Sequence, residues 1–309
     1  MKRYLDCKAS DMDKMTKEDF LHSIAASEGR LIVTEVIGSR EAALGDVTNA
    51  EVAAAMGADI ILLNVFDVDN PIMYGMPKVE PQEVIRTIKK FTGRKVGINL
   101  EPLEAEKENQ EGFLKLSNGR KGTLENAKKA VDMGVDFIVL TGNPGVGVTN
   151  RAIVDTVKIY KENLGDNLGD KLVIVAGKMH AAGILSEAGE KIITKEDIKE
   201  FANAGADIIL MPAPGSVPGI TMEYIRELVC YAHELGKLTL TAIGTSQEGA
   251  DISTIRQIAL MCKMAGTDLH HLGDAGYNGM ALPENILEYG KVIRGVRHTY
   301  RRMAHSIMR

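Results

Sequence analysis

Eight short apolar runs, rich in Val, Ile and Leu, recur along the chain and are bounded by Gly, Asp or Pro. Near-continuous runs of this kind are typical of parallel strands that are covered on both faces. Segments with apolar residues at i, i+3 and i+4 separate the runs and predict amphipathic helices. The runs lie near 30–38, 58–67, 95–102, 136–144, 171–179, 206–215, 237–246 and 267–276. Strands that alternate with helices in this way predict βα units joined by right-handed crossovers.

The starts of the runs repeat in pairs along the chain. The second, fourth, sixth and eighth runs begin after Gly, one residue and Asp, in the segments MGADIILLN, MGVDFIVLT, AGADIILMP and AGTDLHHLG. The third run begins differently, as GRKVGINLE, and the other odd runs resemble it. Since a barrel packs its interior in layers from alternate strands, this repeat favours a closed barrel over an open sheet. We therefore predict an α/β fold, a (β/α)8 TIM barrel that forms a single domain over residues 1–309.

The two ends of the chain predict further helices. Within an N-terminal extension over 1–29, Thr16 begins a start signal for a helix over 17–28, which is expected to plug the barrel bottom or to pack beside the last helix. The segment from Pro283 to about residue 309 predicts a long final helix that turns basic. Its arginines are expected to form a solvated face or, as the alternative, a contact between copies of the chain; they are Arg294, Arg297, Arg301, Arg302 and Arg309.

Polar residues gather at the ends of the predicted strands, where (β/α)8 barrels carry their functional groups. Side chains alternate between the two faces of a strand. If Asn64 faces the lumen, His271 therefore does so too, and His270 faces the helix layer. In the third strand, Asn99 and Glu101 share one face, and their polarity indicates that this face is the lumen.

Alignment of the first strand with the third places Glu35 beside Asn99, although a shift of one residue would turn Glu35 outward. A buried polar side chain in the lumen costs free energy unless it is paired or useful. The structural alternative is a hydrogen-bond network that only fixes the barrel. The catalytic candidates are Glu35, Asn99, Glu101, Lys178, His180 and His271, and the substrate-binding candidates are Asn64, Asp67, Thr141 and Asn143.

The candidates suit acid–base chemistry. Glu101 or Glu35 is expected to act as general base, with His271 or His180 as acid or electrophile. A lysine at a barrel mouth holds a carboxylate or phosphate as a point charge, or forms a Schiff base with a carbonyl. Lys178 is the candidate for this role, and a solvent-facing loop lysine is the alternative.

The loops after the seventh and eighth strands, IGTSQEGAD and LGDAGYNG, predict a phosphate site. Barrels often hold phosphate there, and glycines let backbone amides approach an anion. Neither loop contains Lys or Arg, so the backbone amides would do most of the binding, and the affinity would be modest unless Lys178 or Arg120 closes over the anion. The loop TGNPGVGVTN after the fourth strand is the second candidate. The predicted phosphate-binding residues are Gly244, Thr245, Ser246, Gly273, Asp274 and Gly276.

A divalent metal is a further hypothesis. Oxygen-rich ligands would favour Mg or Mn over Zn, but no short-spaced ligand motif supports a metal, so the ligands stay undecided. The residues that would have to converge are Glu35, Glu101, His180, His271 and Asp274.

Composition narrows the partners. A net charge of −5 offers no basic surplus for nucleic acid, and no apolar run approaches the 18 residues of a membrane span. Cys7, Cys230 and Cys262 lie far apart and fit a reducing, cytoplasmic location without disulfides. Long loops over 102–121 and 179–193 are expected to act as lids over a small-molecule pocket. A homo-oligomer is possible.

The alternating strands and the two glycine loops resemble the aldolase-type, phosphate-binding TIM barrels. The opening DCKASDMDKMTKEDFLHSIAASEGR, followed by a barrel, resembles an uncharacterised bacterial family whose members are sometimes labelled phosphonomutase-like or hydrolase-like. The resemblance implies an enzyme that acts on a small phosphorylated metabolite, such as a sugar phosphate, as aldolase, lyase or isomerase. The alternatives are a metabolite-binding, regulatory barrel without turnover and a divalent-metal-dependent hydrolase.

Overall fold

Eight parallel strands close into a barrel in the computed structural model, each paired with the next in sequence and the last with the first. The structure describes residues 2–104, 116–142, 147–163, 172–181 and 184–309. The predicted (β/α)8 fold is confirmed, and each strand lies within its predicted run. The strands are β1 (Leu31–Ile37), β2 (Ile60–Asn64), β3 (Lys95–Leu100), β4 (Phe137–Leu140), β5 (Val173–Gly177), β6 (Ile208–Pro212), β7 (Leu238–Ile243) and β8 (Leu269–Leu272).

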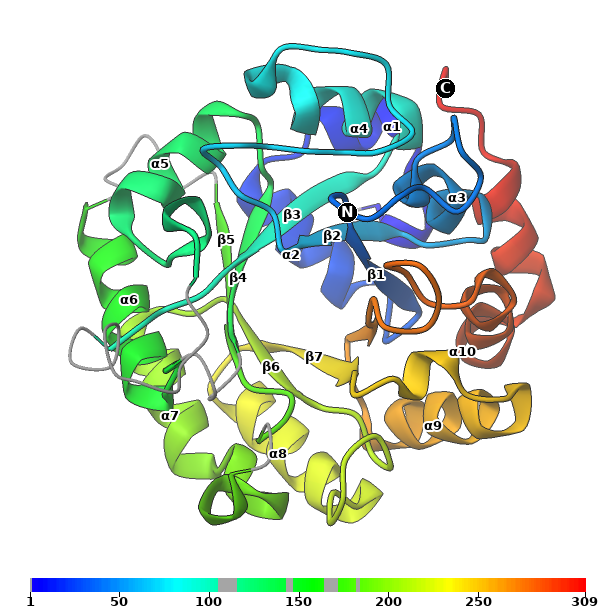
Figure 1. The fold of residues 1–309 in the computed structure, drawn as a ribbon. Coiled ribbons are helices and arrows are strands. Elements are labelled where there is room, and N and C mark those ends of the chain that lie inside the picture. Colours follow the sequence, from blue (N-terminus) through cyan, green and yellow to red (C-terminus); the bar gives the residue numbers. More distant parts are fainter. Residues whose placement is uncertain (1, 105–115, 143–146, 164–171, 182–183) are drawn as a thin grey trace.

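Helices form a ring around the barrel (Figure 1). Side-chain caps begin several of them: Thr48, Thr194 and Asp251 each accept a backbone N–H of the first turn. The ring consists of α3 (Asn49–Ala55), α4 (Val84–Thr92), α5 (Leu124–Asp132), α6 (Asn150–Asn163), α7 (Lys195–Ala204), α8 (Met222–Glu234), α9 (Ile252–Ala265) and α10 (Pro283–Ala304). No helix in the described part of the chain is long and apolar enough to cross a membrane.

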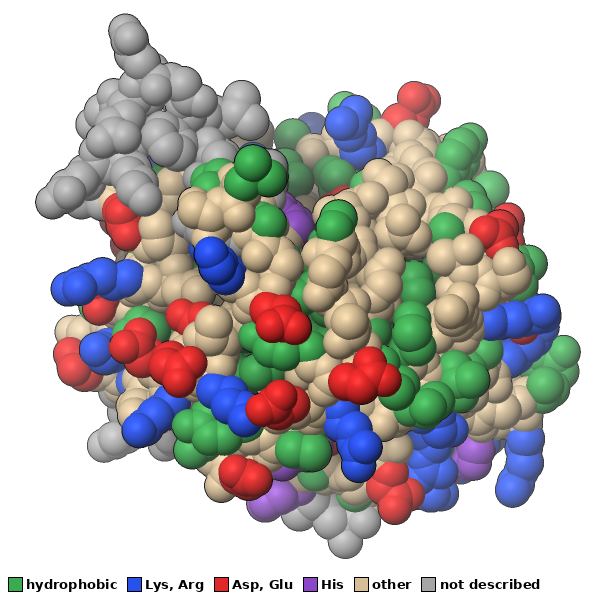
Figure 2. Space-filling model, turned by 90° about the horizontal axis from the view of Figure 1, so that it is seen from below, with side chains coloured by type: hydrophobic (Ala, Val, Ile, Leu, Met, Phe, Trp, Pro, Cys, Tyr) green, Lys and Arg blue, Asp and Glu red, His purple; other side chains and the backbone are tan. Residues whose placement is uncertain are grey.

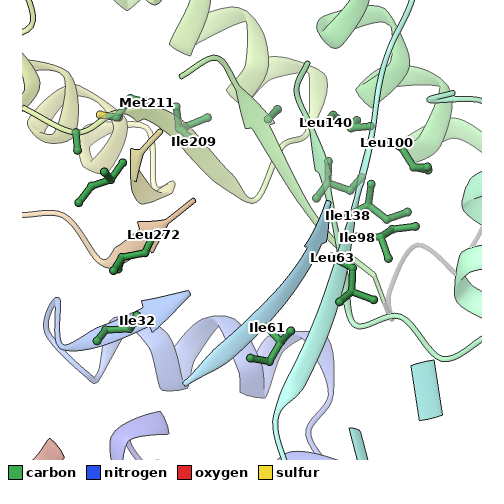
Figure 3. Close-up of a cluster of buried hydrophobic side chains, with 14 of the residues drawn as sticks. Ile32, Ile61, Leu63, Ile98, Leu100, Ile138, Leu140, Ile209, Met211 and Leu272 are labelled. Atoms are coloured by element: carbon green, nitrogen blue, oxygen red, sulfur yellow. The ribbon is translucent and has the colours of Figure 1, made fainter. Parts of the chain in front are cut away.

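The outward side chains of the strands form one apolar layer against the helices, and Figure 3 shows part of it. Ile61 and Leu63 of β2 belong to this layer, whereas Ile60 and Leu62 point into the lumen and pack in a second cluster. The two-residue period of a strand imposes this division, because successive side chains lie on opposite faces.

Each Asp of the Gly-x-Asp repeat binds the neighbouring odd strand at the barrel bottom. Its carboxylate accepts a backbone N–H at 2.8–2.9 Å. A charge-assisted bond of this kind is stronger than a neutral one and fixes the pairing of the two strands. The four acceptors and donors are Asp59 with Ile32, Asp136 with Val96, Asp207 with Ile174, and Asp268 with Thr239. The Gly-x-Asp repeat therefore arises from this hydrogen bond as well as from the layered packing of side chains in the lumen.

The N-terminal extension plugs the bottom of the barrel, which was one of the two expected positions. It forms the 3-10 helix η1 (Tyr4–Asp6), α1 (Ala9–Asp13) and α2 (Lys17–Ala25). The rings of Tyr4 and Phe20 lie 5.6 Å apart, and Phe20 lies 6.4 Å from Phe137 of β4. These side chains join the apolar cluster inside the lumen and close its lower end.

The arginines of α10 are not all on a solvated face, so that expectation was wrong for two of them. Arg294 and Arg302 are buried and both pair with the carboxylate of Asp59. The helix bends between them at Gly295, where φ is 75° and ψ is 166°. Only glycine adopts this conformation without strain. The bend lets both guanidinium groups reach one carboxylate beneath β2.

The outer surface carries both signs of charge. Figure 2 shows basic and acidic side chains interspersed over the side of the barrel that faces down in Figure 1. Such a surface offers no continuous basic stripe on this side.

Removal of the buried carboxylate should destabilise the barrel. Asp59→Asn leaves Arg294 and Arg302 buried without their counter-ion, and we expect a loss of about 3–5 kcal/mol in the free energy of unfolding. Urea unfolding measures this. The control is Asp155→Asn, whose half-exposed carboxylate lies 3.8 Å from Arg151 and should change stability by less than about 1 kcal/mol. Equal effects of the two substitutions would contradict this role of Asp59.

Candidate active site

A carboxylate and an imidazole meet in the lumen near its carboxyl end. Glu35 extends from β1 and His271 from the adjacent β8, and both are buried. His271 Nε2 lies 3.4 Å from Glu35 Oε2. Neither ring nitrogen of His271 has a hydrogen-bond partner among the described residues. In contrast, His270 points outward, as the alternation predicted, and its nitrogens lie 2.9 Å from Tyr289 Oη and from the Gly29 carbonyl oxygen.

An amide chain leads to a second carboxylate at the same place. Asn99 Nδ2 donates to Asn64 Oδ1 at 3.2 Å, and Asn64 Nδ2 donates to Asp274 Oδ2 at 2.8 Å. The backbone N–H of Val65 also donates to Asn64 Oδ1, which fixes the orientation of the amide. Asn99 Oδ1 is buried and has no hydrogen-bond partner in the described ranges. The predicted residues of β1, β2, β3 and β8 thus come together.

Asp274 has the electrostatics of a proton-transfer group. Burial and, to a smaller extent, the nearby charge of Glu35 together raise the pKa of its carboxyl from 3.8 to about 6, although the hydrogen bond from Asn64 and the nearby His271 oppose the shift. A catalytic acid or base is most effective when its pKa lies near the working pH. Asp274 was predicted to bind phosphate, and its raised pKa makes it a candidate for proton transfer as well.

Glu248 is a member of this cluster that the sequence analysis missed. It lies in the 3-10 helix η8 (Gln247–Gly249) after β7 and is almost fully buried. Its Oε1 accepts the backbone N–H of Ala275 at 2.8 Å. Burial raises the pKa of its carboxyl, the neighbouring His271 lowers it, and Asp274 raises it. No periodic pattern marks a loop residue of this kind, so only the glutamate itself within IGTSQEGAD could have signalled it.

The carboxylate of Glu248 lies against the loop after β8, where phosphate binding was predicted. A Cβ on Gly273 would lie 2.5 Å from Glu248 Oε1, and the Gly273 amide already donates to the Ile243 carbonyl. A Cβ on Gly249 would lie 3.0 Å from Gly276, so these glycines allow the two loops to pack together. An anion beside Gly273 would meet the carboxylate of Glu248. The structure therefore gives the predicted site at Gly273 no support.

The remaining residues of that prediction serve the β7 loop itself. Thr245 and Ser246 both have left-handed backbone conformations, with φ of 58° and 70°. Thr245 Oγ1 donates to the Ser216 carbonyl at 2.9 Å. A Cβ on Gly244 would lie 3.1 Å from the sulfur of Met179, which reaches over from the end of β5.

A second polar group forms on the rim, after β2 and β3. Glu101 is buried and pairs with Arg120, and burial raises the pKa of Glu101 while Arg120 lowers it. Arg120 also lines a pocket of about 200 Å³ together with Asp67. Asp67 accepts backbone N–H groups from Asp69 and Asn70, so its own loop holds it in place. At this pocket, the cationic side chain of Arg120 lines a cavity at the mouth of the barrel.

Lys178 and His180 follow β5, on the opposite side of the barrel from β1. Lys178 is buried, and burial together with the Lys178 charge lowers the pKa of His180. Thr141 is buried at the end of β4, and Asn143 lies outside the described residues. Within the described residues, no group of three or more His, Cys, Asp or Glu side chains is arranged to hold a metal ion. The candidate metal ligands are instead divided among the cluster, the rim and β5.

Comparison with known proteins places the sequence in a family without assigning it an activity. Residues 5–309 match the family described as Domain of unknown function (DUF7916). The chain belongs to this family. No curated protein matches the sequence.

Solved structures share the fold at low sequence identity. An archaeal fructose 1,6-bisphosphate aldolase is 13% identical, with 91% of this chain and 99% of that chain covered and a TM-score of 0.57. A 2,3-dimethylmalate lyase of the PEP mutase/isocitrate lyase superfamily is 13% identical over 85% and 82%, with a TM-score of 0.51. The carboxyl transferase domain of Rhizobium etli pyruvate carboxylase is 13% identical over 96% and 51%, with a TM-score of 0.53. At such identities the likeness shows the barrel fold alone.

The raised pKa of Asp274 can be observed directly. Carbon-detected NMR of side-chain carboxyls should show a group that titrates near pH 6 and is lost in Asp274→Asn. Glu35→Gln removes a neighbouring negative charge, so the titration midpoint of Asp274 should fall. Asp155→Asn should leave it unchanged. If Asp274→Asn removed no signal from this range, our description of the cluster would be wrong.

Stability should depend on the same ionisation. The pKa of Asp274 is higher in the folded chain than its ordinary 3.8, so the folded state loses stability as the pH rises from about 4 through about 6. Asp274→Asn cannot ionise and should gain up to about 3 kcal/mol over the unsubstituted protein between pH 4 and pH 7. Urea unfolding at both pH values measures the gain. A gain that is the same at pH 4 and pH 7 would argue against a buried ionising carboxyl.

Proposed function

We propose that this protein is an enzyme that moves a proton at a carbon next to a carbonyl group, as a lyase, aldolase or isomerase on a small hydroxylated metabolite. The observation that carries the proposal is the buried imidazole of His271, whose two nitrogens have no hydrogen-bond partner in the described residues and lie beside Glu35 and Asp274. Buried polar atoms are normally satisfied. A substrate carbonyl or hydroxyl group would satisfy them here.

Asp274 is the group that would transfer the proton. Its ionised carboxylate would take a proton from the carbon beside the carbonyl, and the electron pair of that C–H bond would form the C=C bond of an enediolate. With a pKa of about 6, Asp274 is ionised at neutral pH and can still return the proton. Return of the proton to the neighbouring carbon, with transfer of the hydroxyl proton to the former carbonyl oxygen, completes an isomerisation. Departure of a leaving group from the next carbon, with the electron pair of the C–O⁻ bond restoring the carbonyl, completes an elimination.

His271 would hold the carbonyl oxygen on which negative charge develops. An imidazole N–H that donates to this oxygen stabilises the enediolate more than the ground-state carbonyl. Glu35 would keep the ring of His271 in place, since its Oε2 lies 3.4 Å from Nε2. Asn99 and Asn64 keep the carboxylate of Asp274 oriented through their amide chain.

We also propose a different binding place for the phosphate of a phosphorylated substrate. Glu248 disfavours a phosphate between the loops after β7 and β8. Arg120 at the rim pocket is a cation that would receive a phosphate or carboxylate tail, if the substrate displaced Glu101 from it. The overall similarity to the aldolase and lyase barrels is one of fold, so it supports the location of the site but not the substrate.

Hydrogen exchange tests the proposed chemistry without knowledge of the product. Candidate hydroxy-carbonyl compounds, each with and without a phosphate, would be incubated with the protein in D₂O and followed by proton NMR. Loss of the C–H signal beside the carbonyl is expected for at least one pair. Asp274→Asn and His271→Gln should slow this loss by about 10²–10⁴-fold, whereas Asp155→Asn should leave it unchanged.

The outcomes separate the alternatives. Binding that stabilises the protein, with no exchange in any compound, would favour the regulatory barrel and contradict the proposed enzyme. Exchange that survives Asp274→Asn would exclude Asp274 as the base. Exchange of a phosphorylated compound that Arg120→Gln weakens through KM, but not through kcat, would support Arg120 as the binding group for its anionic tail.

A further inference from the structure

A second pocket opens at the other end of the barrel from the candidate active site. It has a volume of about 720 Å³, which is within the range of small-molecule sites. Its walls come from α1, the last turn of α4, the first residue of β3 and residues 307–309. Figure 1 shows α1, α4 and the C-terminal end of the chain near one another. Because Lys95 begins β3, the pocket lies at the amino ends of the strands, far from their functional face.

The charge of this pocket contrasts with that of the chain. The whole chain carries a net charge of −5. The described residues that line the pocket include a single acidic side chain, Asp13. The cationic side chains of the lining are Arg86, Lys89, Lys90, Arg94, Lys95 and Arg309. Such a concentration of one sign in a concave surface attracts anions.

Part of this positive charge is not neutralised by contact with a carboxylate. Arg86 pairs with Glu83, and Lys89 and Lys95 share Asp136. Arg94 is buried and donates to three backbone carbonyl oxygens, those of Ala58, Gly93 and Arg302. These bonds fix the guanidinium group but leave its charge.

Arg94 and Lys90 show that positive charge is in excess at this pocket. Burial and, to a smaller extent, the nearby charge of Arg302 lower the pKa of Arg94 to about 10, although Asp59 opposes the shift. Lys90 is exposed and has no ion pair with any described residue. An anion in the pocket would relieve the repulsion felt by Arg94 and would give Lys90 a partner.

Large apolar side chains also line the pocket. Met12 and Phe91 contribute from α1 and α4, and Ile307 and Met308 from the end of the chain. Met308 is 89% exposed and Ile307 44% exposed, although both are large apolar side chains. A ligand that covered them would bury apolar surface as well as pair with the cations. Inorganic phosphate alone would pair with the cations but would leave the apolar side chains uncovered.

We propose that this pocket binds a small phosphomonoester with an apolar body, at a site separate from the barrel mouth. The cations of α4 and β3 would hold the phosphate, and the apolar side chains of α1 and residues 307–309 would cover the body. The bound ligand would join the N-terminal plug, α4 and the end of the chain. It would therefore stabilise the folded state by linkage.

Phenyl phosphate is a suitable probe, measured by calorimetric titration and by the shift in melting temperature of the full chain. Inorganic phosphate and phenol serve as matched ligands that carry only the anion or only the apolar body. Phenyl phosphate should bind at least about tenfold more tightly than either. Lys90→Glu should weaken it by about tenfold or more, whereas Lys199→Glu, the same charge reversal on exposed α7, should change it less than twofold.

The site is distinguished from the barrel mouth by a third variant. Asp274→Asn should leave the affinity for phenyl phosphate unchanged. Absence of saturable binding at millimolar concentration would overturn the proposal. Equal effects of Lys90→Glu and Lys199→Glu would overturn it as well, and loss of binding in Asp274→Asn would move the ligand to the mouth of the barrel.

Discussion

The barrel depends on one repeated interaction, the bond between an aspartate at the start of each even strand and a backbone amide of the preceding odd strand. Asp59, Asp136, Asp207 and Asp268 make the same bond at the bottom of the barrel. Because a slip of one residue would turn every side chain of a strand to the other face, four fixed pairings at one end determine which residues face the lumen at the other. The direct pairing of β1 with β8 then places Glu35 next to His271.

The two ends of the barrel use buried polar groups in opposite ways. At the bottom, Asp59 is surrounded by arginines and an amide, and these contacts hold the plug and α10 in place. At the mouth, His271 and Asn99 retain atoms without partners in the described residues, and the carboxyls of Asp274 and Glu248 are shifted toward the protonated form by burial. An arrangement that is poor for stability and yet maintained by the fold is typical of a functional site.

Much of this could be predicted from the sequence, because the informative residues lie in strands with a strict period. The alternation predicted the inward direction of Asn99 and His271 and the outward direction of His270, and the structure has all three. The loops carry no such period. Gly273 and Gly276 were interpreted as open anion sites, but a side chain at Gly273 would meet Glu248 and one at Gly276 would meet Ala281, contacts that no local pattern reveals. The basic pattern of α10 gave no sign that a bend would bury Arg294 and Arg302. In both places, contacts between residues far apart in the sequence determine the structure.

A crystal structure with a compound that undergoes exchange would test the central claim most directly, namely that Glu35, His271 and Asp274 form the reaction centre. The account predicts a carbonyl or hydroxyl oxygen of the compound within about 2.6–3.2 Å of a ring nitrogen of His271, with the reacting carbon facing the carboxylate of Asp274. A compound bound elsewhere in the mouth, with His271 and Asp274 untouched, would contradict it.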